Sequence, residues 1–229
     1  METLETLPAI IGSAKAMIDE KPYRIGPSAI AARMNPYGKG VADNPASGRV
    51  CLTNRDPRQR GLFNAAWTLG YVAACAYGGV TSVAIGAATG PLGFVHHRAA
   101  DRPQPYFDAI NGPAVYPAFH VMSGLARGGG HHLVKMKLSE PGKVAALAWR
   151  EGARIVLWLA NLTADPLTIR MSGFEDAPLQ ASVLNSSAFE QAVARLDTLD
   201  ALRRPLEVPE LNLDAYAVAR VEGDTKQAP

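Results

Sequence analysis

The stretch that decides the fold is FNAAWTLGYVAACAYGGVTSVAIG, residues 63–86. Its bulky apolar side chains first recur at helical spacing, from Phe63 to Ala74. The Gly78-Gly79 pair then supplies a helix stop. Val80 to Ile85 is short, apolar and partly β-branched, which predicts a buried strand. The glycines, Gly70 among them, interrupt the apolar run, so it is typical of a helix plus a strand rather than a membrane span.

The same alternation extends to both sides of this stretch. Upstream, apolar spacing predicts an amphipathic helix over residues 2–19, and Tyr23 to Ile30 predicts another buried strand. Downstream, a further helix is predicted over Tyr116 to Ala126. Helix, strand, helix, strand, helix is a parallel βα pattern, but two strands are too few to close a barrel or sustain a sheet. We therefore expect further strands upstream of Met1.

The hydrophobic period changes after Gly128-Gly129-Gly130. Short apolar runs separated by turn residues replace the helical spacing, which predicts an antiparallel β-sandwich. The expected strands are residues 133–138, 144–149, 155–162, 167–171, 181–184 and 215–221. Residues 187–203 carry only a weak helical pattern and are left unassigned. The sequence thus predicts an α/β part over residues 1–128 and an all-β part over residues 129–229.

Composition narrows the function classes. The 229 residues are 48% hydrophobic, which is typical of a globular protein. The net charge is only +2, and no basic stripe indicates binding to nucleic acid. The first residues lack the basic head and apolar run of a signal peptide, which indicates a cytoplasmic protein. Cys51 and Cys75 do not make a disulfide framework and are expected to be reduced and semi-buried. Nothing in the sequence indicates a cofactor or a membrane partner.

Charge is unevenly distributed along the chain. Residues 21–139 contain no glutamate, and residues 21–100 carry nine Lys or Arg against two acids, Asp43 and Asp56. Such a segment suits an anionic or oxygen-rich ligand, but it offers almost no carboxylate for acid–base catalysis.

Four short sequence motifs resemble the D-apionate lactonase family, and the resemblance covers essentially all of the chain. They are YRIGPSAI at residues 23–30, RMNPYG at 33–38, DPRQ at 56–59 and TGP at 89–91. Members of this family resemble glycoside hydrolases, with an N-terminal β-domain, a central barrel and a C-terminal β-domain. The resemblance implies that this chain is the family's C-terminal half: the end of a (β/α)8 (TIM) barrel followed by an antiparallel β-sandwich. It also implies hydrolysis of a sugar-acid lactone such as D-apionolactone.

In barrels the chemistry lies at the carboxyl ends of the strands. Here a long loop over residues 33–56 leaves the first strand, and loops of that length are usually functional. Arg33, Asn35 and Tyr37 open it, and Arg58 follows its end. An arginine guanidinium and a side-chain amide can donate hydrogen bonds to the carboxylate that forms when a lactone opens. They can also stabilise the oxyanion that precedes this carboxylate. The alternative is that Arg33 pairs with Asp56 to pin the loop.

Two further positions have a functional and a structural interpretation. Asp56 is a candidate general base, but Pro57 follows it, so an N-cap role is the stronger expectation. Thr89 and Gly90 follow the second strand and could shape the substrate floor, because glycine lets backbone N–H groups approach a ligand. A tight turn explains them equally well.

Other chemistries fit the sequence less well. The pairs at residues 96–97 and 131–132 are histidines, but adjacent residues on a strand point to opposite faces, so no metal site is expected. Ser28 lies outside a nucleophile-elbow motif, and Trp149 and Trp158 are expected in the core rather than in a sugar platform. Retaining glycosidases of the related barrels need a carboxylate nucleophile at the end of the seventh barrel strand, paired with an acid–base carboxylate. The resemblance makes residues 23–30 that strand, and residues 28–33 at its end contain no acid. A non-catalytic fragment remains an alternative, and half a barrel would need its missing half or a second copy as partner.

Overall fold

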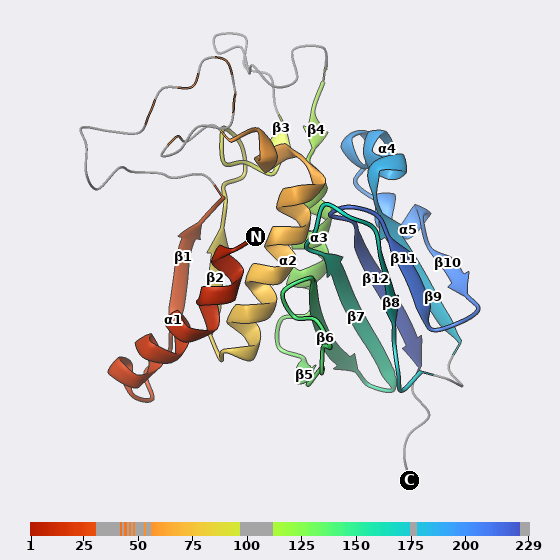
Figure 1. The fold of residues 1–229 in the computed structure, drawn as a ribbon. Coiled ribbons are helices and arrows are strands. Elements are labelled where there is room, and N and C mark those ends of the chain that lie inside the picture. Colours follow the sequence, from red (N-terminus) through yellow and green to blue (C-terminus); the bar gives the residue numbers. More distant parts are fainter. Residues whose placement is uncertain are drawn as a thin grey trace.

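The structure, a computed structural model, describes residues 1–30, 42, 44, 46, 48, 53, 56–96, 112–174 and 178–224. Helices pack on one face of a small parallel sheet in the first part of the chain, and antiparallel sheets form the second part (Figure 1). This is the predicted order, the end of a barrel followed by a β-sandwich.

The first part contains the predicted βα units. Helix α1 (Thr3–Ile18) precedes strand β1 (Arg24–Ser28), and helix α2 (Leu62–Tyr77) precedes strand β2 (Ser82–Ile85). The two strands are parallel, with Arg24 opposite Ser82. The helices pack together through Ile11, which is buried against α2 beside Trp67. The parallel βα pattern is therefore confirmed, with strands shorter than predicted.

The prediction that both strands are buried is wrong. One face of the strand pair packs on α2, where Ile25 and Val83 join the apolar cluster that contains Trp67. The other face carries Arg24, Ser82 and Ala84, which are exposed. In the described part of the chain no element covers that face, so the strands alternate between half-buried and exposed positions.

The start of the second helix is interrupted. Asp56 caps a 3-10 turn, η1 (Pro57–Arg60), by accepting a hydrogen bond from the Arg58 backbone N–H at 2.9 Å. Gly61 then has extended backbone, and α2 begins after it. The predicted cap is thus confirmed, but the helix is two elements rather than one. Helix α2 ends at Gly78-Gly79 as predicted, and Gly79 has a φ of +74°.

The chain then returns to the sheet end through short elements. Strands β3 (Val95–His96) and β4 (Ala114–Val115) pair antiparallel and were not predicted, because two residues are too few to show a period. Helix α3 (Pro117–Ala126) confirms the predicted helix, with proline in its first turn. Within the described ranges, none of the helices combines the length and apolar character needed to cross a membrane.

Among the described residues the second part forms two antiparallel sheets, with strand orders β10-β9-β12-β7-β6-β5 and β11-β8. Their bounds are β5 His132–Val134, β6 Val144–Glu151, β7 Arg154–Asn161, β8 Leu167–Arg170, β9 Leu179–Leu184, β10 Arg204–Leu206, β11 Glu210–Leu213 and β12 Val218–Asp224. The sandwich is confirmed. The strand predicted over residues 133–138 ends at Val134, and β10 and β11 were missed. The unassigned residues 187–203 hold η2 (Ser186–Ala188), α4 (Phe189–Ala194) and α5 (Thr198–Ala201).

The helices of the first part and the large sheet of the second share one apolar core. Leu69 of α2 and Val121 of α3 are fully buried against Leu147 of β6 and Trp158 of β7. Figure 1 shows α2 and α3 lying beside β6 and β7. Trp149 and Trp158 are therefore core residues, as predicted, and they lie where the two parts meet.

Helix α3 comes very close to these two tryptophans through glycine. A Cβ on Gly124 would overlap Cζ2 of Trp158 and lie 2.5 Å from its Cη2. A Cβ on Gly128, in the turn that follows the helix, would lie 3.0 Å from the ring of Trp149. Glycine at these two positions lets the backbone of the helix and of the turn rest directly on the indoles, which a larger residue would prevent.

Candidate functional site

The candidate site is built where β1 and β2 end. Their carboxyl ends are joined by a hydrogen bond of 2.7 Å from the Gly86 N–H to the Ser28 carbonyl oxygen. The loop after β2 then approaches η1, because the Gln59 amide donates to the Leu92 carbonyl oxygen at 3.1 Å and to the Gly93 carbonyl oxygen at 3.4 Å. Two segments far apart in the sequence therefore meet at one end of the sheet.

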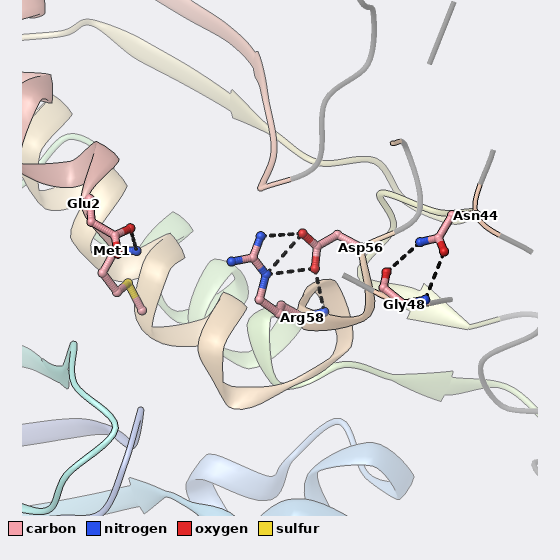
Figure 2. Close-up of polar contacts among 6 residues, drawn as sticks. All are labelled: Met1, Glu2, Asn44, Gly48, Asp56 and Arg58. Atoms are coloured by element: carbon pink, nitrogen blue, oxygen red, sulfur yellow. Dashed lines mark hydrogen bonds and ion pairs between the residues drawn. The ribbon is translucent and has the colours of Figure 1, made fainter. Parts of the chain in front are cut away.

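Asp56 and Arg58 form a bidentate ion pair at this end (Figure 2). Arg58 Nε lies 2.9 and 3.1 Å from the two carboxylate oxygens, and Nη2 lies 2.5 Å from Oδ2. The Asp56 side chain is 6% exposed and that of Arg58 is 29% exposed. A planar guanidinium that meets a carboxylate through two nitrogens is held in a defined orientation.

This geometry bears on both roles considered for Asp56. The carboxylate caps η1 and orients Arg58 at once, since its oxygens accept from the Arg58 backbone and side chain together. A role as general base would require Arg58 to turn away first, because both oxygens already accept hydrogen bonds. Arg33, the alternative partner for Asp56, lies outside the described residues.

Gln59 and Asn64 are buried polar residues of the site region that received no role from the sequence. Gln59 is 2% exposed and holds the loop after β2 through its amide. Asn64 is 1% exposed and donates to the Gln59 carbonyl oxygen at 3.1 Å, which fixes η1 on the first turn of α2. Their positions in the sequence, just after the Asp56-Pro57 cap, were the signal that could have indicated a structural role. An amide that is buried beside such a cap needs fixed hydrogen-bond partners.

Thr89 and Gly90 occupy the turn of the loop after β2. Gly90 has a φ of +84°, and its carbonyl oxygen accepts from the Gly93 N–H at 2.9 Å. A Cβ on Gly90 would face open space, so this glycine is required by the backbone conformation. Thr89 is exposed. The turn interpretation accounts for this geometry, and a contact with substrate stays a prediction.

Three of the candidates, Arg33, Asn35 and Tyr37, lie outside the described residues. Within the long loop, Asn44 is 4% exposed. Its amide bonds twice to the backbone of Gly48: Nδ2 donates to the carbonyl oxygen at 2.7 Å, and Oδ1 accepts from the N–H at 3.0 Å (Figure 2). Asn44 therefore pins one turn of the loop, a role that the sequence did not indicate.

Ser28 ends β1 but faces helix α2. Its hydroxyl lies 2.6 Å from that of Tyr71, whose ring stacks on Trp67 at 4.8 Å. Burial raises the pKa of Tyr71, and the hydrogen bond with Ser28 only partly offsets this. A phenol that holds its proton cannot activate a serine as a general base. Ser28 is thus a packing contact of the strand end.

The histidines and the described cysteine lie apart from the site. His131 and His132 are exposed, His96 is buried, and His97 lies outside the described residues. No group of three His, Cys, Asp or Glu side chains suited to a metal ion occurs among the residues that were searched, which are the described ones. Cys75 is a free, buried thiol, and burial raises its pKa to about 11.

Comparison with known proteins places both parts of the chain. Residues 1–130 match the family model described as D-apionate lactonase, TIM barrel domain, and residues 141–221 match the model described as D-apionate lactonase, C-terminal immunoglobulin-like domain. The chain belongs to the D-apionate lactonase family. A curated D-apionate lactonase from Brucella anthropi is 36% identical over 174 residues, which cover 76% of this chain. The match spans only 27% of that relative's length.

Solved structures agree on the fold. The α-L-arabinofuranosidase of glycoside hydrolase family 51 from Thermotoga petrophila superimposes on 97% of this chain and 49% of its own, with a TM-score of 0.57 and 12% identity. A family 39 β-xylosidase from Caulobacter crescentus covers 96% of this chain and 48% of its own, with a TM-score of 0.50 and 16% identity. At such identities the likeness concerns architecture alone, a barrel end followed by a β-domain.

Proposed function

We propose that the protein carrying this chain hydrolyses a sugar-acid lactone, D-apionolactone to D-apionate, in carbohydrate catabolism. The observation that carries the proposal is the family match, which extends over both parts of the chain. The relative's name, D-apionate lactonase, supplies the substrate class. Because the chain matches about a quarter of that relative, the proposal concerns the whole enzyme, to which this chain contributes the C-terminal part.

The charge of the first part suits this chemistry. When water adds to the lactone carbonyl and the ring C–O bond breaks, negative charge develops on the carbonyl oxygen, and one carboxylate and one proton are released. Residues 21–100 carry nine Lys or Arg against two acids, so they suit an anionic product. We assign Arg33 to the developing oxyanion, and Asn35, Tyr37 and Arg58 to the substrate oxygens.

Asp56 and the loop after β2 complete the proposed site. Asp56 is proposed as a catalytic residue in one of two ways: it orients Arg58, or it accepts a proton once Arg58 has moved. Its ion pair with Arg58 supports the first. Thr89 and Gly90 are proposed to shape the substrate floor. The hydrogen bond from Gln59 to Leu92 supports this, because it joins their loop to the segment that carries Arg58.

Glycoside cleavage is the second candidate, and the glycosidase-like fold favours it. A retaining glycosidase needs a nucleophilic carboxylate paired with an acid–base carboxylate. Residues 29–42, which follow β1, contain no Asp or Glu. This argues for lactone hydrolysis over glycoside cleavage. A non-catalytic β-module remains the third candidate.

We also propose how the chain is organised and where it works. The change from helix α3 to strand β5 supports a boundary near Gly128–Gly130, with domains at residues 1–128 and 129–229. A cytoplasmic enzyme without metal or cofactor, and without nucleic-acid or membrane partners, fits the composition. The exposed face of β1 and β2 supports a need for a partner, either an upstream barrel half or a second copy of the chain.

A proton titration tests the proposed activity. D-Apionolactone is added to this chain and to the same chain preceded by whatever in-frame sequence the genome encodes, and released acid is titrated at constant pH. The extended protein is expected to release one proton per lactone, and the 229-residue chain much less. Arg33→Ala should cost about 2–4 kcal/mol of transition-state stabilisation, comparable with loss of an oxyanion donor.

Arg24→Ala is the matched control, because Arg24 lies at the opposite end of β1 from the proposed site. It should keep the activity that Arg33→Ala loses. Full activity in the Arg33→Ala protein would remove Arg33 from the site. Cleavage of aryl glycosides by the extended protein, without lactone hydrolysis, would overturn the function.

A further inference from the structure

The guanidinium of Arg58 touches more than Asp56. Its central carbon lies 4.8 Å from the centroid of the Phe63 ring, in the first turn of α2. The Phe63 ring in turn meets Tyr216 edge-on, with centroids 5.2 Å apart and planes inclined by 63°. Tyr216 lies between β11 and β12, in the second part of the chain. A continuous series of contacts therefore runs from Asp56 at the strand ends to the antiparallel sheets.

The backbone of Tyr216 is unusual. Its φ is +57°, a left-handed conformation that costs energy for a residue with a Cβ. The surrounding loop imposes it: the Tyr216 N–H donates to the Thr163 carbonyl oxygen at 3.2 Å. The buried amide of Asn161 donates to the carbonyl oxygens of Leu213 and Asp214, just before the tyrosine, at 3.1 and 3.0 Å. Glycine would adopt this conformation without cost, so a tyrosine at this position needs an explanation. The contact of its ring with Phe63 provides one.

The orientation of Arg58 depends on these contacts from two sides. Asp56 fixes the donor edge of the guanidinium through its carboxylate. The ring of Phe63 fixes its flat face, because a cation over an aromatic face is attracted by the ring quadrupole. The ring of Phe63 is itself held by Tyr216, since edge-to-face pairs prefer defined angles. Without Tyr216, Phe63 can change rotamer and release the face of Arg58.

We infer that Tyr216 is a positioning residue for the proposed lactonase site, acting on Arg58 through Phe63. The inference rests on the proposed function for its substrate. It makes the C-terminal β-domain a structural part of the active site rather than an appended module. We expect the ring of Tyr216 to matter and its hydroxyl not to, because its contact with Phe63 is made between the two rings.

Three variants in the extended protein separate positioning from folding. Tyr216→Phe keeps the ring and serves as the control, while Tyr216→Leu removes the aromatic contact. Tyr216→Gly removes the ring but relieves the left-handed backbone, so its stability should fall less than that of Tyr216→Leu. We expect the KM for the lactone to rise about tenfold in the Leu and Gly variants, since a misplaced binding group loses substrate contacts. Tyr216→Phe should stay within about twofold of the parent.

A merely structural role predicts a different result. Loss of folded protein lowers the apparent kcat and leaves KM unchanged. The fall in apparent kcat then follows the fall in melting temperature from variant to variant. If KM stays at the parental value in both the Leu and the Gly variants, or if Tyr216→Phe loses as much as Tyr216→Gly, the inference is overturned.

Hydrogen exchange measured by mass spectrometry gives a readout that needs no activity. The Arg58 N–H donates to Asp56 and the Gln59 N–H to the Asp56 carbonyl oxygen, so residues 57–62 report on the order of η1. Exchange in this peptide should be several-fold faster in Tyr216→Gly than in Tyr216→Phe, with the peptide of α1 unchanged. That result without any lactonase activity would refute the proposed function and retain the positioning role. Equal exchange in the Gly and Phe variants would refute the positioning role itself.

Discussion

Replacing helical glycines by alanine tests whether α3 is seated against the sheet as the structure has it. Alanine is favoured over glycine inside a helix by about 0.5–1 kcal/mol, so the sign of each effect depends on what the new methyl group meets. Gly12 in α1 faces open space, and Gly70 in α2 faces the tip of Leu4 at 2.6 Å. Gly124 in α3 faces the indole of Trp158, which is fully buried. The three substitutions share one chemistry and differ in surroundings.

The expected magnitudes follow from those neighbours. Gly12→Ala should raise the free energy of unfolding by about 0.5–1 kcal/mol, the propensity gain alone. Gly70→Ala should be close to neutral, because the end of a leucine can rotate away. Gly124→Ala places a carbon inside the contact distance of a ring that cannot move, and overpacking of this kind costs about 1–3 kcal/mol. When the gain in helix propensity is subtracted, the free energy of unfolding should fall by about 1–2 kcal/mol.

Urea unfolding followed by tryptophan fluorescence measures these differences, and thermal melts give a second reading. For a chain of this size about 1 kcal/mol corresponds to 2–4 °C in Tm, so Gly124→Ala should melt roughly 3–6 °C below the parent. Trp158→Phe shortens the ring and should recover part of the loss when combined with Gly124→Ala, as a double-mutant cycle would show. If Gly124→Ala stabilises the protein as much as Gly12→Ala does, helix α3 does not rest on Trp158 and the shared core is refuted.

Three further predictions concern single groups. In a Cys51→Ser background, Cys75 should react with a thiol reagent at pH 8 about a hundredfold or more slowly than a free thiol, because its pKa of about 11 leaves little thiolate; fast labelling without urea would contradict its burial. Burial lowers the pKa of His120, so the unfolded state takes up a proton first and stability should fall as pH drops below about 6.5. His120→Gln should flatten that pH dependence, measured by urea titration at each pH. Asp56→Ala should cost about 1–2 kcal/mol of stability through the lost cap and ion pair, and Asp56→Asn, which can still cap, should cost less.

Elements were predictable where the hydrophobic period was long and the end signals were clear. The sixteen residues of α2 combine apolar spacing with a Gly78-Gly79 stop, and both were identified. Strands β10 and β11 were missed because they are three and four residues long and lie beside prolines and charged residues. The strand expected over residues 133–138 ends early since Lys135 to Leu138 leave the sheet, which an alternating pattern alone cannot reveal.

The sequence predicted which segments of the chain form the candidate site, but it predicted few of the contacts between their side chains. The rule that barrel chemistry lies at the carboxyl ends of strands placed Asp56 and Arg58 correctly at that end of the sheet. The ion pair between them spans two residues, but it was not predicted, because the sequence analysis considered Arg33 as the partner of Asp56. The contacts from Gln59 to Leu92 and from Phe63 to Tyr216 span 33 residues or more, and nothing in local spacing predicts which distant side chain a buried amide or ring will meet.

The failed burial prediction for β1 and β2 has a physical reason that bears on function. On the face away from α2 the strand pair brings small groups together: a Cβ on Gly26 would lie 2.7 Å from the Cβ of Ala84, its neighbour across the sheet. Glycine and alanine at such a position leave room for bulkier side chains from other strands, as the layered interior of a barrel requires. The sequence pattern of a buried strand therefore describes the assembled barrel, in which this face is covered. We therefore expect Ala84 to be buried only where further strands complete the barrel, and the lactonase site that we propose would need those strands as well.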